Sequence, residues 1–379
     1  MQYRFFGSLE FRVSALGFGC MRLPTLEEEP KQVDEDLAVA MIRYAIDHGV
    51  NYVDTAYPYH GGQSERVLGK ALADGYREKV KIATKLPTWA CETADDFDRL
   101  LDEQLERLGV DRVDFYLLHN LQATLWPKVR DLGVVGWLER EVGGDRFGHA
   151  GFSFHHSYEL FAEILDAFDG WTLAQVQYNF MNEQVQAGTK GVELAASRGL
   201  AVVVMEPLLG GCLAAPPPQV QAVYDAAPAR RTPADWALQW LWHTPEVSVV
   251  LSGMSTMAQV EENVASAARS GVGTLSLAEL SVIEAAREAY EKLAVVPCTA
   301  CSYCMPCPEG VDIPRNFRLL NDARVFGGNQ TALTRNLYRG LPEPARAAAC
   351  VACKECEEKC PQGIAISEWM PTIAEQFEE

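Results

Sequence analysis

Eight of the eleven cysteines lie in two short runs near the end of the chain. The first run, CTACSYCMPCP, places a cysteine at every third position, and the second, CVACKECEEKCP, has the spacing C-x2-C-x2-C-x3-C-P. Zinc and iron–sulfur clusters both accept four thiolates, but zinc sites typically use two C-x2-4-C pairs rather than two runs of four. The runs therefore predict two [4Fe–4S] clusters, with zinc as the alternative. The predicted ligands are Cys298, Cys301, Cys304, Cys307, Cys350, Cys353, Cys356 and Cys360.

The second run resembles that of bacterial ferredoxins, in which three cysteines hold one cluster and the fourth, before a proline, holds the other. The resemblance implies that each run gives its fourth cysteine to the other cluster. One cluster would then be bound by Cys298, Cys301, Cys304 and Cys360, and the other by Cys350, Cys353, Cys356 and Cys307. The segments GVDIP and GIAIS, one after each run, are predicted to form matching short strands.

A second set of side chains suited to proton transfer follows three apolar runs near the start of the chain. Asp54 ends VNYVD with Tyr57 and Tyr59 close behind, Lys85 follows VKIAT, and His119 ends DFYLLH. A tyrosine, with a pKa of about 10, needs help to act near neutrality. A lysine ammonium favours the phenolate, and a carboxylate keeps that lysine charged. Brought together, these side chains would form a proton-transfer site.

The elements that must position these side chains can be read from the hydrophobic pattern. Short β-rich runs alternate with helical segments up to about residue 275. The runs are 15–19, 50–54, 80–84, 114–118, 149–153, 173–177, 201–205 and 247–251. This alternation predicts an α/β fold, a closed (β/α)8 TIM barrel, whose functional groups lie at the carboxyl ends of the strands. An open doubly wound sheet shares the alternation, but LGFGCM is not its glycine-rich fingerprint.

Outside the barrel repeat, a hairpin around Gly7 and Ser8 is expected to close the barrel floor, and a helix over 277–293 is expected to precede the cysteine-rich tail. We therefore expect a barrel domain over residues 1–293 and a small ferredoxin-like iron–sulfur domain over residues 294–379.

The motifs VDTAYPY, ATKLP and YLLHN, in this order and on successive predicted strands, resemble those of the aldo/keto reductases. The resemblance implies that Asp54, Tyr59, Lys85 and His119 form the catalytic tetrad, because Tyr59 stands five residues after the aspartate as the family's general acid does. Lys85 and Asp54 are expected to lower the pKa of the Tyr59 phenol. The alternatives are four unrelated polar residues at strand ends, or a barrel that keeps the tetrad but serves as a non-catalytic electron-transfer or assembly subunit.

The resemblance also implies a nicotinamide cofactor, NAD(H) or NADP(H), across the barrel mouth. Its expected contacts are Ser153, Gln177, Glu206, Leu208, Gly210, Gly253, Ser255, Gln259, Glu262 and Asn263. Relatives that prefer NADPH commonly place a lysine and an arginine where this chain has Gly253 and Gln259. We therefore expect no preference for NADPH. Trp89 and Trp126, in the loops after two predicted strands, suggest an aromatic-lined pocket that suits a ring-shaped or sugar-like substrate.

Composition limits the partners and the compartment. The formal net charge of −19, without a compensating basic run, would repel nucleic acid and anionic lipid. No apolar run approaches the roughly 18 residues of a membrane span, so we expect a cytoplasmic protein. The expected function is an oxidoreductase that interconverts a small-molecule carbonyl and an alcohol. Nicotinamide moves two electrons as a hydride whereas the clusters move single electrons. Three cluster roles stay open: structural, electron relay to a substrate or flavin, or connection to a redox partner protein.

Overall fold

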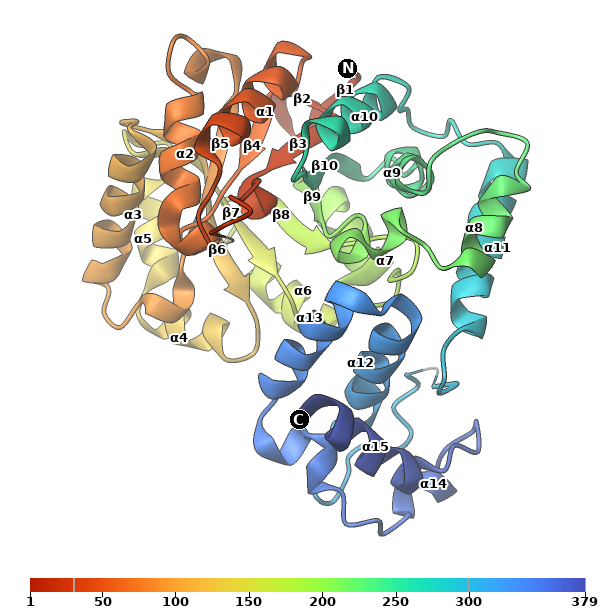
Figure 1. Cartoon of the computed structure of the whole chain (residues 1–379). Helices are drawn as coiled ribbons and strands as arrows, with labels where there is room; N and C mark the ends of the chain where they lie inside the picture. Colours follow the sequence, from red (N-terminus) through yellow and green to blue (C-terminus); the bar gives the residue numbers. More distant parts are fainter. Residues whose placement is uncertain (30, 299, 379) are drawn as a thin grey trace. The chain divides into compact units, whose positions relative to one another are not determined.

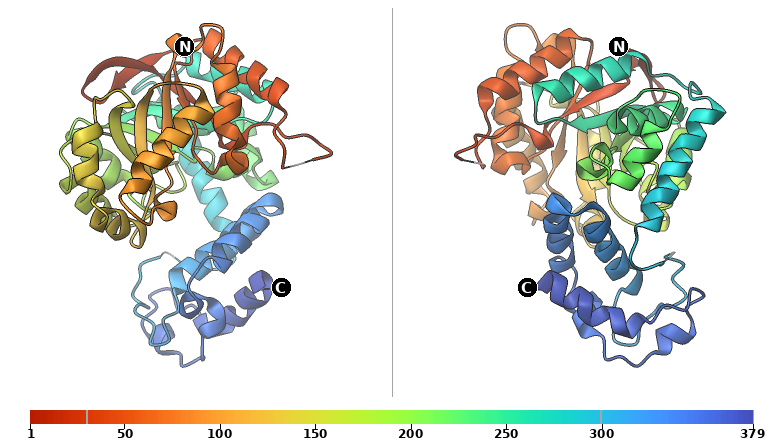
Figure 2. Two further views of the ribbon diagram at one scale, coloured as in Figure 1. Left: turned by 90° about the vertical axis from the view of Figure 1, so that its left-hand side faces the viewer. Right: turned by 45° about the vertical axis from the view of Figure 1, so that its right-hand side comes forward.

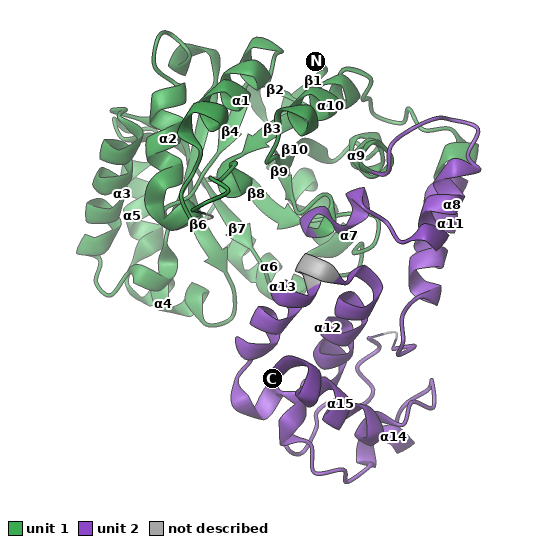
Figure 3. Ribbon diagram, in the orientation of Figure 1, with its two compact units in different colours: residues 1–209, 234–280 green, residues 210–233, 281–379 purple. Residues whose placement is uncertain are grey.

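The computed structural model describes the chain from residue 1 to residue 379 except residues 30, 299 and 379, and it leaves out the side chains of residues 328–330. The chain forms two compact units (Figure 3). The first comprises residues 1–209 and 234–280, and the second comprises residues 210–233 and 281–379.

The first unit contains a closed barrel of eight parallel strands (Figure 1). The strands follow one another around the barrel in chain order, and the last pairs with the first. All eight runs predicted as barrel strands are strands, so the predicted barrel is confirmed. The strands are β3 (Leu16–Gly19), β4 (Tyr52–Asp54), β5 (Lys81–Leu86), β6 (Val113–Leu121), β7 (Phe147–Phe154), β8 (Trp171–Gln177), β9 (Ala201–Met205) and β10 (Val247–Gly253).

A hairpin closes the amino-terminal end of the barrel, as predicted. It consists of β1 (Tyr3–Phe6) and β2 (Leu9–Ser14), which pair antiparallel. The Phe6 side chain is buried, and its ring centroid lies 4.7 Å from that of Phe115 on β6. At the hairpin turn Gly7 has a φ of +56°, and a Cβ there would stand 2.5 Å from the carbonyl oxygen of Gly199. Only glycine fits so close to the backbone that leads into β9.

Amphipathic helices surround the barrel, and side chains cap the starts of α1 and α10. The Asp34 side chain caps α1 by accepting from Leu37 N, and the Thr256 side chain caps α10. Within the described residues, no helix has both the length and the apolar character needed to cross a bilayer. The helices of this unit are α1 (Glu35–Asp47), α2 (Gln63–Ala71), α3 (Asp95–Leu108), α4 (Leu125–Asp131), α5 (Val134–Glu141), α6 (Tyr158–Asp166), α7 (Gly188–Ser197), α9 (Pro233–His243) and α10 (Met257–Ala268).

The second unit is helical in its described residues (Figure 2). It has an apolar core of its own. Phe317 and Leu320 of α12 and Ile373 and Phe377 of α15 are buried in this core. The helices are α8 (Pro218–Asp225), most of α11 (Leu277–Lys292), α12 (Ile313–Phe326), α13 (Gly328–Arg339), α14 (Glu355–Glu358) and α15 (Ile366–Glu378).

The short strands predicted after the two cysteine runs are wrong, because both segments lead into helices. Ile313 begins α12, whose cap Asp312 accepts a hydrogen bond from Arg315 N. Ile366 begins α15 in the equivalent place after the second run. The two tail segments therefore do match each other, but as helix starts.

The predicted domain boundary at residue 294 lies within the second unit, since α11 and residues 210–233 group with the cysteine-rich tail. One contact behind this grouping joins Tyr290 of α11 to Phe326 of α12, whose ring centroids are 5.3 Å apart. The end of the barrel domain at residue 293 stays a prediction.

Candidate functional site

The carboxyl ends of three neighbouring strands bring the four predicted catalytic side chains together. Asp54 ends β4, Tyr59 lies in the turn that follows, Lys85 is near the end of β5 and His119 near the end of β6. Lys85 Nζ donates to Asp54 Oδ1 over 2.5 Å and lies 3.5 Å from Tyr59 Oη. The rings of Tyr59 and His119 meet edge to face with centroids 5.9 Å apart. The four side chains thus form one cluster at one end of the barrel.

The charge balance at Tyr59 differs from the prediction. Burial raises the pKa of the Tyr59 phenol, the Lys85 ammonium lowers it and the Asp54 carboxylate raises it. Only Lys85 acts as predicted, because a carboxylate disfavours a second negative charge nearby. Burial lowers the pKa of Lys85, but Asp54 and Tyr59 raise it more, so the net shift is upward and the lysine is charged.

His119 offers a neutral ring beside the tyrosine. Burial lowers the pKa of His119 well below its ordinary value. Its Nδ1 atom is buried and has no hydrogen-bond partner in the described part of the chain. The Trp89 ring, whose residue is 39% exposed, lies 5.1 Å from the imidazole. Trp126 is fully buried and donates to Glu163, so the prediction that it lines a pocket is wrong and it belongs to the core.

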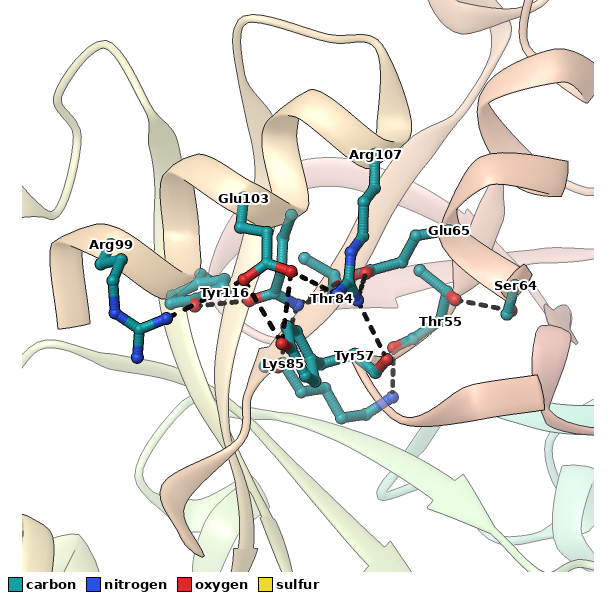
Figure 4. Close-up of polar contacts among 11 residues, drawn as sticks. Thr55, Tyr57, Ser64, Glu65, Thr84, Lys85, Arg99, Glu103, Arg107 and Tyr116 are labelled. Carbon is teal, nitrogen blue, oxygen red and sulfur yellow. Dashed lines mark hydrogen bonds and ion pairs between the residues drawn. The ribbon is translucent and has the colours of Figure 1, made fainter. Parts of the chain in front are cut away.

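Tyr57 and Tyr59 occupy different surroundings, although both follow Asp54 closely. The Tyr57 hydroxyl lies 3.3 Å from both carboxylate oxygens of Glu103, and the Arg107 guanidinium lies 4.1 Å from the centre of its ring (Figure 4). Tyr59 is therefore the tyrosine beside Lys85, and Tyr57 contacts α3.

Two hydrogen bonds that hold Asp54 and Lys85 in place were not predicted from the sequence. Gln175 Nε2 donates to Asp54 Oδ2 over 3.1 Å, and Lys85 Nζ donates to the Thr55 carbonyl over 2.8 Å. A signal for Gln175 existed, because it stands two positions before Gln177 on one strand, and alternate residues of a strand share a face. A contact to a backbone carbonyl leaves no such signal.

The residues predicted to hold the cofactor lie at the ends of four other strands. Ser153 of β7 accepts from Asn120 N over 2.8 Å, and Gln177 of β8 accepts from the Gln186 side chain. After β9, the predicted residues Glu206, Leu208 and Gly210 fall in a segment with left-handed backbone. There Glu206, Leu209, Gly210 and Gly211 have φ values of 53°, 49°, 67° and 100°.

Two residues of α10 that were predicted to contact the cofactor hold the end of β10 and the loop that follows it. Gln259 Oε1 accepts from Ser255 N over 2.8 Å, and Asn263 Nδ2 donates to Ser252 Oγ over 3.0 Å. Glu262 is exposed on α10. These contacts fix the loop that begins at Gly253, so the chain reaches α10 in a defined path.

Arg22 lies beside this loop, and the sequence analysis did not name it. A Cβ placed on Gly253 would stand 2.9 Å from Arg22 Cγ, and Ser255 Oγ donates to the Arg22 carbonyl over 2.8 Å. Arg22 is exposed. Arg22 is thus a basic side chain of the loop after β3 that lies close to the loop after β10.

The two cysteine loops have the same backbone form despite different sequences. In the first, Ala300 and Ser302 flank Cys301 with φ values of 53° and 62°. In the second, Ala352 and Lys354 flank Cys353 with φ values of 55° and 66°. Such left-handed residues turn backbone N–H groups inward to form an anion-binding nest. Ala352 N donates to the sulfur of Cys350 over 3.4 Å, and Ala300 N makes the equivalent bond to Cys298.

The fourth cysteine of the second run lies near the first run. Burial raises the pKa of Cys298, and the Cys301 and Cys360 thiolates raise it further. Burial also raises the pKa of Cys304, and the thiolates of Cys298, Cys301 and Cys360 raise it further.

The donors of the two runs fit an iron–sulfur cluster by their chemistry. All eight cysteines are free thiols, and in the second run Ala352 N donates to the Cys350 sulfur. Thiolates bind the irons of such clusters, and hydrogen bonds to the sulfurs accompany them. Among the described residues, no three His, Cys, Asp or Glu side chains converge closely enough to hold one metal ion.

The barrel also matches a known family model. Residues 15–280 match the model described as aldo/keto reductase family. The chain belongs to the aldo/keto reductase family. Residues 297–365 match the model described as 4Fe-4S dicluster domain, so this family member carries an iron–sulfur domain after its barrel. It is an oxidoreductase of the aldo/keto reductase type.

Individual relatives agree with this assignment. An L-galactose dehydrogenase from Arabidopsis thaliana is 31% identical over 290 residues, which are 70% of this chain and 88% of the relative. A probable aldo-keto reductase from Glycine max is 26% identical over 69% of this chain and 83% of its own. The holo form of an aldo-keto reductase from Bacillus halodurans superposes with a TM-score of 0.62 at 25% identity, covering 76% of this chain and 96% of its own.

Proposed function

We propose that the barrel interconverts a carbonyl compound and an alcohol with NAD(H) or NADP(H), and that residues 294–379 carry two [4Fe–4S] clusters of structural or electron-relay role. The observation that supports the barrel chemistry most directly is the position of Lys85. Its buried ammonium is 2.5 Å from Asp54 and 3.5 Å from the Tyr59 hydroxyl. This is the arrangement that makes a phenol a usable acid and base.

In the reducing direction, Tyr59 Oη gives its proton to the carbonyl oxygen. Lys85 stabilises the negative charge that remains on the phenolate oxygen, and Asp54 keeps the lysine charged. The neutral imidazole of His119 holds the same substrate oxygen by a hydrogen bond. When bound, the nicotinamide supplies the hydride that the carbonyl carbon receives. In the oxidising direction Tyr59 takes the alcohol proton, and the same contacts hold the substrate.

The chain offers the proposed clusters a set of eight thiolates, and the ferredoxin-like spacing of the second run supports a crossed grouping of them. When bound, such clusters carry single electrons. Clusters reduced with dithionite, freed of excess reductant and followed by electron paramagnetic resonance, would separate the two proposed roles. A relay predicts that the reduced clusters lose their electrons when the carbonyl substrate or a flavin is added, and a purely structural role predicts that they stay reduced.

A titration tests whether the barrel is catalytic. Protein purified without oxygen should bind about one nicotinamide per chain in calorimetry with NADH. With NAD⁺ it should then oxidise L-galactose, the sugar in the name of the Arabidopsis relative, and with NADH it should reduce nitrobenzaldehyde as a general carbonyl probe. A barrel without measurable affinity for NADH or NADPH would contradict the proposal and favour a non-catalytic electron-transfer or assembly subunit.

NADH is expected to bind at least as tightly as NADPH. Neither Gly253 nor Gln259 offers a charge to the 2′-phosphate, and a lost charge-assisted hydrogen bond costs about 1.5–3 kcal/mol. Calorimetry with both cofactors measures the difference. If the Kd for NADPH were more than about tenfold below that for NADH, a gap of about 1.4 kcal/mol, the prediction would be wrong. Arg22→Ala would then be the first variant to examine, because Arg22 lies beside this loop.

A further inference from the structure

A buried polar group behind the barrel mouth connects α3 to the loop that carries Tyr59 and to the strand that carries Lys85 (Figure 4). It consists of Glu65 of α2 with Gln104 and Arg107 of α3, and we name these three residues the brace. Glu65 and Gln104 have no exposed surface, and the Arg107 side chain is 13% exposed. Burying so many polar groups is costly unless each finds partners. The proposed chemistry at the barrel mouth uses none of the three.

The first attachment of the brace reaches the Tyr59 loop. Arg107 Nη1 lies 3.3 Å from the carbonyl oxygen of Tyr57 and 3.3 Å from Glu65 Oε2, and the other terminal nitrogen pairs with Glu103. Tyr57 is joined to Tyr59 through Pro58, whose ring restricts its own backbone φ. A shift of the Tyr57 carbonyl is therefore passed on to Tyr59.

The second attachment reaches the Lys85 strand. Gln104 Nε2 donates to the Lys85 carbonyl over 3.1 Å, to Thr84 Oγ1 over 3.0 Å and to Glu65 Oε1 over 2.7 Å. The Tyr116 hydroxyl donates to Gln104 Oε1 over 2.7 Å, so the amide is held at both ends. Residues three apart on a helix share a face, and Gln104 and Arg107 are so spaced.

We propose that the brace positions the general acid, with Arg107 holding the Tyr59 loop at hydrogen-bond distance from Lys85. Arg107 touches neither reacting atoms nor cofactor, so it is a positioning residue. The inference rests on the proposed function for its catalytic meaning, since it assumes that Tyr59 transfers the proton. Its structural content, the placement of Tyr59 against Lys85, can be measured without turnover.

Arg107→Ala tests the proposal, and Arg99→Ala is the matched control. Arg99 lies on the same helix and is 58% exposed in its side chain. It hydrogen-bonds Asp96 and lies 4.0 Å from Glu103, but its side chain is not bonded to the Tyr57 carbonyl or to Glu65 as that of Arg107 is. A displacement of about 1 Å can cost about 10²-fold in rate, so Arg107→Ala should lower kcat for nitrobenzaldehyde by about that factor and leave the Kd of NADH unchanged. Arg99→Ala should match the wild type in both.

A spectroscopic readout separates positioning from general loss of structure. The charged and titratable groups that face Tyr59 are Lys85, Asp54, His119 and Cys20. In protein labelled with ¹³C at the tyrosine Cζ, the Tyr59 signal is assigned by its loss in Tyr59→Phe. Because Lys85 lowers the pKa of Tyr59, moving the phenol away should shift its titration to higher pH in Arg107→Ala but not in Arg99→Ala.

Removing Arg107 leaves the buried Glu65 without its cation, so Arg107→Ala can fail to fold. Arg107→Lys keeps a charge near Glu65 but cannot contact Tyr57 and Glu103 at once. It should fold and show an intermediate loss of kcat. A normal Tyr59 titration in a folded Arg107 variant would overturn the proposal, as would a wild-type kcat. An inactive wild type with a shifted Tyr59 titration in Arg107→Ala would uphold the brace and contradict only the proposed function.

Discussion

Tyr59→Phe should lower turnover by about 10²–10⁴-fold, which is the usual cost of losing a positioned general acid. The substitution removes one oxygen and keeps the ring, so the edge-to-face contact with His119 survives. Lys85 keeps its bonds to Asp54 and the Thr55 carbonyl. The folded state and the cofactor contacts are therefore expected to change little. Steady-state rates with nitrobenzaldehyde and calorimetry with NADH measure the two effects separately.

Tyr57→Phe is the matched control, because it removes the phenolic oxygen of a tyrosine that stands two residues before Tyr59. Its hydroxyl lies 3.3 Å from Glu103, on the side of α3, and the tyrosine near Lys85 is Tyr59. We expect Tyr57→Phe to retain most of the activity. A crippled Tyr57→Phe together with an active Tyr59→Phe would show that the general acid had been assigned to the wrong residue.

The barrel could be predicted from the sequence because its strands are short, apolar and separated by amphipathic helices. Val202, Val203 and Val204 of β9 are consecutive and fully buried, which is typical of a strand covered on both faces in a parallel sheet. The positions of Asp54 and Lys85 followed from the same pattern, because polar residues that end buried strands stand out.

The electrostatics and the brace could not be predicted in the same way. The raised pKa of Tyr59 depends first on burial, which side chains from several elements create together. The bond from Gln104 to the Lys85 carbonyl links residues of a helix and a strand through a backbone group that any residue type possesses. Local sequence patterns carry no trace of such a contact.

The tail shows how a helix start can be mistaken for a strand. Val311 and Ile313 are β-branched and apolar, which favours a strand in a short segment. Asp312 followed by Pro314 is, however, a helix-start signal, since Asp caps and proline is tolerated in the first turn. Giving the capping pair more weight than the two β-branched residues would have predicted α12 correctly.

Anaerobically purified protein should contain about eight irons and eight inorganic sulfides per chain, the content of two [4Fe–4S] clusters. Metal analysis and sulfide determination measure this directly. Cys212→Ala is the control, because Cys212 belongs to neither cysteine run. That variant should keep its full iron content. Zinc in place of iron, or only about four irons, would contradict the assignment.

Substitution of single ligands then tests the crossing of the fourth cysteines. If the runs cross, Cys307→Ala should damage the same cluster as Cys353→Ala, a middle ligand of the second run. Cys360→Ala should likewise damage the same cluster as Cys301→Ala. Electron paramagnetic resonance of the reduced variants compares the surviving cluster in each pair. If Cys307→Ala instead matched Cys301→Ala, each run would hold its own cluster.

The electrostatics favour crossing on the side of Cys360, because its thiolate raises the pKa of both Cys298 and Cys304. For Cys307 we expect crossing because the backbone after it resembles the backbone after Cys360. Gly310 N donates to the Cys307 carbonyl and Gly363 N to the Cys360 carbonyl, and both glycines are left-handed. The chain thus turns in the same way after each fourth cysteine before α12 or α15 begins. Because crossed ligands tie both runs to each cluster, removing iron with a chelator should unfold the tail as one step, measured by loss of helical circular dichroism.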